Sequence, residues 1–176
     1  GATGIGLYLF SRSFWNTNLN TVKLLSEYYK FCYGKAAVAV EQAQEILQSD
    51  SMQSKPALAK AIRLLSKESA HLSLDSLEGK RLLCFKAYLH YLKLLYDVQS
   101  SNGQQYPGVC DELMYFTYGI FKRMMVNPVP INEWLKTYSR FPLYANKYWD
   151  TFNPTKVGMK YNKVVPWTDE QINSAF

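Results

Sequence analysis

The sequence lacks the residue patterns that identify most enzyme sites. It contains no H-E-x-x-H, C-x-x-C, G-x-S-x-G or P-loop pattern, and such patterns set metal ligands, nucleophiles or phosphate-binding amides at the spacing their chemistry requires. The glycines of the first segment, Gly1, Gly4 and Gly6, resemble those of a dinucleotide-binding loop. Such a loop needs a strand before it to position it, and no strand precedes these glycines. The adjacent acids Asp111 and Glu112 point to different helix faces and make a poor acid and base pair. We therefore expect no catalytic, cofactor-binding or metal-binding residue, and a protein that is not an enzyme.

Histidine and cysteine are both scarce. His71 and His90 are the two histidines, and the three cysteines, Cys32, Cys84 and Cys110, lie far apart in the sequence. A disulfide framework or a zinc site needs cysteines or histidines in close pairs, so neither is expected. The apolar surroundings of the cysteines predict core packing, and His90 is expected in the core or at an interface. This usage fits a reducing, intracellular compartment.

Long apolar runs and long runs of like charge are also missing. The apolar start GATGIGLYLF is shorter than the roughly 20 residues that span a membrane, but residues 1–10 can lie at a membrane surface or dock on a neighbouring chain. The formal net charge is +6, which allows an acidic partner. Because the cations are scattered, a solvated surface is favoured over a nucleic-acid footprint.

What the sequence does contain is a helical pattern. The 176 residues are 48% hydrophobic and 19% charged, which is typical of one globular domain with a real core. From Asn20 onward apolar residues recur at intervals of three and four. Gly34 is expected to end a first helix, and Ser54 is expected to cap a third.

Further helices are predicted after residue 74. Asp75 and Glu78 form a D-x-x-E capping pair for a long helix that ends near Gln99. Pro107 opens an apolar, central helix, and the prolines of NPVP at residues 127–130 end it. A short helix is expected near 131–138. The prediction is an all-α fold, an irregular bundle of about five or six helices, with an apolar N-terminal arm (1–19), a helical body (20–138) and an extended docking tail (139–176).

The tail is rich in aromatic residues and is interrupted by prolines. Its own apolar burial is too small to offset the conformational entropy lost on ordering it, so another surface must complete it. That surface is either the helical body or a partner subunit. A T-x-x-Q box at Thr168 and Gln171 predicts a short capped helix at the end. The residues expected to dock are Phe141, Tyr144, Tyr148, Trp149, Phe152, Tyr161, Trp167, Ile172 and Phe176.

In general style the chain resembles the supernumerary subunits of mitochondrial energy-transducing complexes. The resemblance lies in a small basic helical body, an apolar start that looks processed, and an aromatic end; it covers no specific motif. It implies a non-catalytic accessory subunit of a large complex at the mitochondrial inner membrane, either of the respiratory chain or an ATP synthase, with other protein subunits as partners. An RNA-associated component of an organellar ribosome and a helical enzyme without a recognisable motif remain alternatives.

Overall fold

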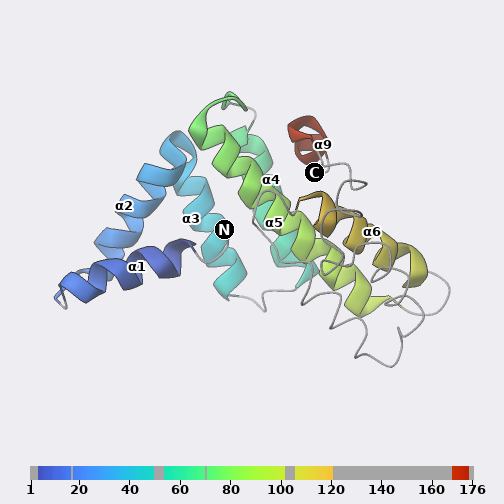
Figure 1. Ribbon diagram of the computed structural model, residues 1–176, viewed down its shortest axis with the longest axis horizontal. Helices are drawn as coiled ribbons and strands as arrows, with labels where there is room; N and C mark the ends of the chain where they lie inside the picture. Colours follow the sequence, from blue (N-terminus) through green and yellow to red (C-terminus); the bar gives the residue numbers. More distant parts are fainter. Residues whose placement is uncertain are drawn as a thin grey trace, which may run out of the picture. The chain divides into compact units, whose positions relative to one another are not determined.

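The described part of the chain is helical. The structure, a computed structural model, describes residues 4–16, 18–49, 54–69, 71–101, 106–120 and 168–174 (Figure 1). These residues contain no strand, so the prediction of an all-α bundle is confirmed for them. The extended tail and the short helix near 131–138 lie outside the described residues. Whether the chain follows the predicted division at 138/139 therefore stays a prediction.

The described residues divide into two compact units. One contains residues up to 90 together with the C-terminal helix α9, Asp169–Ser174, and the other contains the described residues from 91 to 120 and residue 168. The long helix α5, Leu77–Ser100, contributes to both units. Each unit is described separately below.

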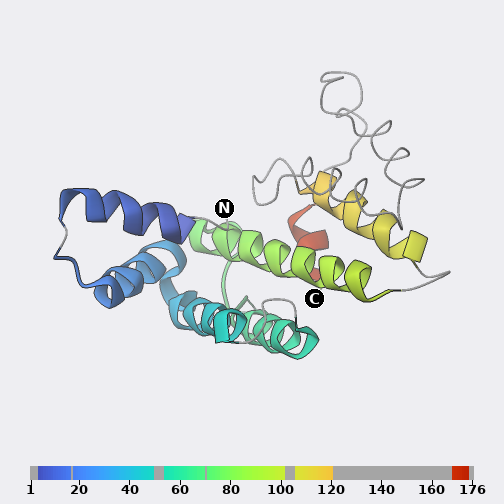
Figure 2. The same ribbon diagram turned by 90° about the horizontal axis from the view of Figure 1, so that it is seen from below.

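The first unit begins with two helices packed on each other. The predicted N-terminal arm forms helix α1, Gly4–Trp15, which contacts α2, Thr21–Tyr33 (Figure 2). Asn20 caps α2, because its side-chain oxygen accepts a hydrogen bond of 3.0 Å from the Lys23 amide. The helical pattern predicted from Asn20 onward therefore begins at the expected residue.

Gly34 ends α2, as predicted. Its φ of +51° is a conformation that residues with a Cβ adopt at a cost, and its amide donates to the Lys30 carbonyl. A short 3-10 turn, Gly34–Ala36, then leads directly into α3, Ala37–Ser49. This short connection makes α2 and α3 consecutive neighbours.

α3 and α4, Lys55–Ser69, form a tightly packed pair. The Ser54 hydroxyl accepts a hydrogen bond of 3.3 Å from the Ala57 amide, which confirms Ser54 as the cap of α4. Small residues on both helices allow close approach. The buried positions are Ala37, Ala39, Val40, Ala43 and Leu47 on α3, and Ala57, Leu58, Ala61 and Leu65 on α4.

The start of α5 differs from the prediction by one residue. Ser76, not Asp75, is the cap: its hydroxyl accepts from the Gly79 amide at 3.0 Å and donates to the Ser73 carbonyl at 2.7 Å. A Cβ at Gly79 would overlap the Ser73 carbonyl oxygen, so the loop before α5 can pack here only against a glycine. Ser76 is a better cap than Asp75 at this position, because its hydroxyl hydrogen-bonds two backbone groups at once, one as donor and one as acceptor.

Arg81 joins the start of α5 to the end of α2. Its Nη1 donates to the carbonyl oxygens of Phe31 (3.1 Å) and Cys32 (3.2 Å), and its guanidinium lies 5.5 Å from the centre of the Phe31 ring. The two carbonyls belong to the last turn of α2, where intrahelical donors are missing. Arg81 therefore supplies both the missing donors and a favourable positive charge.

The second unit is built on a buried helix, α6, Tyr106–Gly119. The predicted apolar helix after residue 106 is confirmed over residues 106–119. Its buried side chains, each 0% exposed, include Cys110, Leu113, Met114, Phe116 and Thr117, and Ile120 directly after the helix is equally buried. The Thr117 hydroxyl donates to the Leu113 carbonyl at 2.6 Å, so its polar group is satisfied within the helix.

Candidate docking surface

Helix α1 has one face on α2. The Tyr8 and Tyr28 rings lie 5.3 Å apart between centroids, and a Cβ at Gly4 would lie 2.8 Å from the Tyr28 hydroxyl oxygen. Ile5, Tyr8 and Leu9 are half-buried along this face. Contacts with α2 thus use one side of α1.

The other side of α1 exposes large apolar side chains. Leu7, Phe10 and Phe14 follow the spacing i, i+3, i+7, which puts them in one stripe, and they are 66%, 62% and 71% exposed. We call these three residues the α1 stripe. The Phe10 and Phe14 rings pack edge to face at 4.6 Å, so the stripe is a continuous surface. Trp15, 92% exposed, follows Phe14 as the last residue of α1.

Exposed apolar residues elsewhere in the described part of this unit are more scattered. Val22, Phe31, Val38 and Leu77 are each more than half exposed, and they belong to three different helices. Isolated exposed apolar residues are ordinary, whereas a contiguous patch marks an interaction site. The α1 stripe is therefore the strongest candidate surface among the described residues.

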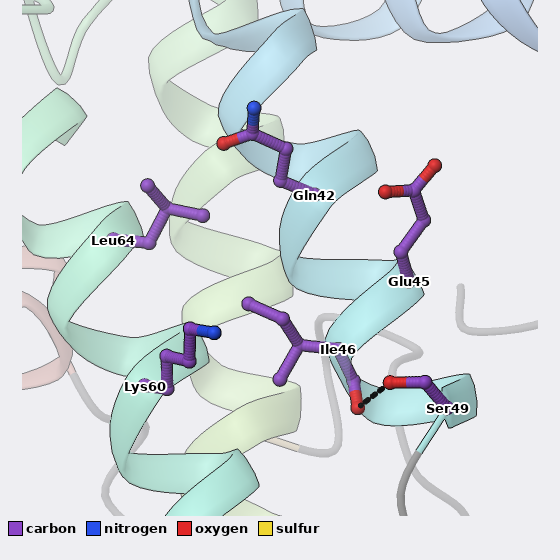
Figure 3. Close-up of a pocket in the computed structure, with 6 residues that line it drawn as sticks. All are labelled: Gln42, Glu45, Ile46, Ser49, Lys60 and Leu64. Atoms are coloured by element: carbon purple, nitrogen blue, oxygen red, sulfur yellow. Dashed lines mark hydrogen bonds between the residues drawn. The ribbon is translucent and has the colours of Figure 1, made fainter.

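A groove lies between α3 and α4. This open groove has a volume of about 500 Å³ and is lined by Gln42, Glu45, Ile46, Ser49, Lys60 and Leu64 (Figure 3). The two helices run in opposite directions here, and Lys60 reaches over the groove from α4 (Figure 3). Ser49 donates its hydroxyl to the Ile46 carbonyl at 3.3 Å. The lining residues contain no histidine or cysteine, and the serine hydroxyl is engaged with backbone, so the groove carries no recognisable catalytic arrangement.

The C-terminal helix is anchored on the first unit. Lys86, only 2% exposed, donates from Nζ to the Asn173 side-chain oxygen at 2.7 Å, and Ile172 is 0% exposed. Burial lowers the pKa of the Lys86 amine, because the charged form loses hydration. α9 begins directly after Thr168, as the T-x-x-Q box predicts. Ile172 therefore belongs to the chain's own core.

Three tyrosines, Tyr28, Tyr29 and Tyr33, lie in the C-terminal half of α2. Burial raises the pKa of Tyr28 to about 12, with Cys32 adding to the effect, and raises that of Tyr29 to about 12, with Glu41 and Glu45 adding to it. Burial also raises the pKa of Tyr33. Neutral phenols at ordinary pH are packing and hydrogen-bonding groups, so these tyrosines do not point to acid and base chemistry.

The histidines and cysteines can be placed, whereas most of the predicted docking residues cannot. His71 is exposed in a turn and His90 is buried. The three cysteines are thiols: Cys110 is buried, and Cys32 and Cys84 are half-buried. In the described ranges no three His, Cys, Asp or Glu side chains are grouped so that they could hold a metal ion. The predicted docking residues outside the described part are Phe141, Tyr144, Tyr148, Trp149, Phe152, Tyr161, Trp167 and Phe176.

The sequence contained the signal for the α1 stripe, since the spacing of Leu7, Phe10 and Phe14 can be read directly. It was obscured because Ile5, Tyr8 and Leu9 make the opposite side of α1 apolar as well, so the segment looks uniformly apolar. Within the described residues, no helix has the length and apolar content to cross a bilayer. No protein-family model, curated protein or solved structure matches this chain.

Proposed function

We propose that the chain is a non-catalytic accessory subunit of a large, membrane-bound protein assembly, of the type found in the mitochondrial respiratory chain or ATP synthase. The observation that carries the proposal is the α1 stripe, where Leu7, Phe10 and Phe14 stand in water beside Trp15. Each such side chain that is removed from water stabilises an association by ~1 kcal/mol, so the three together contribute several times that free energy. A surface of this kind is best explained by an occupant that covers it.

The aromatic segment 139–167 is the second docking element in this proposal. Its composition favours contact with other protein subunits, because Tyr, Trp and Phe supply large contact areas at interfaces. Phe141, Tyr148 and Trp149 are the anchors we would test first. Ile172 is not among them, since it is already buried within the chain.

The experiment is expression of the tagged full chain in cells of its source, followed by native gel electrophoresis of detergent-solubilised membranes. We expect the chain to migrate with a large membrane complex. Replacing Phe141, Tyr148 and Trp149 by alanine should release it from that complex, whereas Val38→Ser, a change at an exposed apolar residue outside both docking elements, should not. Migration of the native chain as a monomer would refute the proposal.

A second candidate function, association with RNA in an organellar ribosome, is favoured by one face of α4. Lys60, Arg63 and Lys67 are exposed on this helix at positions that periodicity brings together. Binding through such cations weakens steeply with salt. Co-sedimentation of the chain with ribosomal particles at low salt, lost in a Lys60, Arg63 and Lys67 triple glutamine variant, would select this function over the first.

A further inference from the structure

We propose that the α1 stripe binds a membrane surface of anionic lipid, with α1 lying flat in the headgroup region. This inference rests on the proposed membership of a membrane-bound assembly and names the occupant of one of its two docking elements. A helix of twelve residues is about 18 Å long, far short of the roughly 30 Å hydrocarbon core. It can therefore lie in the interface but cannot span the bilayer.

The serine hydroxyls of α1 are hydrogen-bonded within the helix, which suits an apolar environment. The Ser11 hydroxyl donates to the Tyr8 carbonyl and the Ser13 hydroxyl donates to the Phe10 carbonyl, both at 2.8 Å. Because each hydroxyl proton already has a backbone acceptor within α1, neither hydroxyl beside the stripe requires a water molecule. Burying a hydroxyl is costly when its donor is left unmet. Both serines of α1 therefore lower the cost of placing this side against lipid.

The charges around α1 complement an anionic surface. Arg12 is the only charged residue of α1, and Glu27, in α2, is the first acidic residue of the sequence. By helical periodicity Arg12 lies roughly opposite the stripe, on the side of α1 that carries Tyr8 and Leu9, so its charge attracts an anionic surface at longer range and does not contact it directly. Lys23 and Lys30 are exposed on α2, the helix that α1 packs against. Near the stripe, repulsion from carboxylates is thus small and attraction to anionic lipid is favoured.

Trp15 marks the level of the interface. Indole rings prefer the boundary between headgroups and acyl chains, because the ring is large and apolar while its N–H needs a polar partner. Trp15 is the most exposed of the large apolar residues in the described ranges, at 92%, and it follows Phe14 as the last residue of α1. A protein partner could also use this ring, but the lack of acidic residues in α1 and the satisfied serine hydroxyls favour lipid.

The test is flotation of the purified full chain with phosphatidylcholine vesicles that contain about one third phosphatidylserine, and with pure phosphatidylcholine vesicles. We expect binding to the anionic vesicles, and weaker binding to the neutral ones. The variant Leu7→Ser, Phe10→Ser, Phe14→Ser should lower the partition coefficient on the order of a hundredfold. The matched control is Val38→Ser, Leu77→Ser, which removes two comparably exposed apolar side chains from other helices and should bind as the native chain does.

A second measurement does not depend on how the triple variant folds. Brominated lipid in the anionic vesicles should quench the tryptophan fluorescence of the native chain, and Trp15→Phe should remove most of that quenching. Absence of vesicle binding by the natively helical chain would overturn the inference, as would binding that survives in the triple variant. Loss of the triple variant from the native complex, without any vesicle binding by the native chain, would assign the stripe to a protein partner instead. That outcome would overturn the lipid inference but leave the proposed subunit function intact. Conversely, vesicle binding by a chain that never joins a complex would support the lipid inference and refute the proposed subunit function.

Discussion

Replacing Ile172 or Asn173 should release the C-terminal helix from the body of the chain. A helix of six residues is not stable in isolation, because nucleation costs more than so few hydrogen bonds return. α9 must therefore be held by its contacts with the first unit. Ile172 is 0% exposed, and Asn173 accepts a hydrogen bond of 2.7 Å from the buried Lys86 amine.

The magnitudes follow from these two contacts. Truncating a buried isoleucine to alanine costs about 2–5 kcal/mol. Removing the acceptor of a hydrogen bond from a charged group costs about 1.5–3 kcal/mol. Because α9 is a separate helix of only six residues, we expect the loss to appear as local opening. For Asn173→Ala, α9 amides should exchange on the order of tenfold faster, and for Ile172→Ala faster still.

The assay is amide hydrogen exchange followed by mass spectrometry on peptides that contain residues 169–174. Ser174→Ala is the control, because Ser174 is exposed and its hydroxyl bonds only within α9, to the Gln171 carbonyl. The double change Lys86→Met, Asn173→Leu should exchange more slowly than Asn173→Ala, since replacing both partners removes the buried amine together with this acceptor. Unchanged exchange in both single variants would show that these contacts do not hold α9.

Three other predictions concern the first unit. Gly79→Ala should destabilise the chain by about 1–3 kcal/mol in urea unfolding, because the new Cβ overlaps the Ser73 carbonyl oxygen; equal stability would refute this packing. Arg81→Met should cost about 1–2 kcal/mol, since two partly exposed charge-assisted bonds are lost, and Arg81→Lys should recover only part of it. Stability should also fall between pH 10 and 12. The tyrosines of the unfolded chain ionise near pH 10, whereas the pKa of Tyr29 in the folded chain is about 12. Rising pH therefore favours the unfolded state, and Tyr29 contributes about 1–2 kcal/mol to this loss of stability. Tyr29→Phe should reduce that loss in a denaturation series followed by circular dichroism.

Local end chemistry explains which parts of the fold could be predicted. Gly34 and Ser54 act through their own backbone or side chain, and the structure confirms both as helix boundaries. On α5, helical periodicity puts Leu83, Ala87, Tyr91, Leu94 and Val98 on one face, and all of them except the half-buried Tyr91 are buried. Signals of this kind depend on a few neighbouring residues, so the sequence contains them in full.

Contacts between distant segments could not be predicted in the same way. The choice of Ser76 over Asp75 as the cap of α5 depends on how the preceding loop packs against Gly79. The burial of Ile172 depends on α9 finding a place beside Lys86, 87 residues away from Asn173 in sequence. The stripe on α1 is a property of what α2 leaves uncovered. Each of these features is decided by tertiary packing, which a pattern of residue types does not specify.

The bond between Arg81 and Phe31 also has a consequence for the order of folding. It joins residues 50 positions apart in sequence and encloses α3 and α4 between its two ends. Closing so long a loop costs chain entropy, and that cost falls once the intervening segment has collapsed into a compact helical hairpin. We therefore expect the α3–α4 hairpin to form first, and substitutions at Arg81 to speed unfolding while leaving the refolding rate almost unchanged.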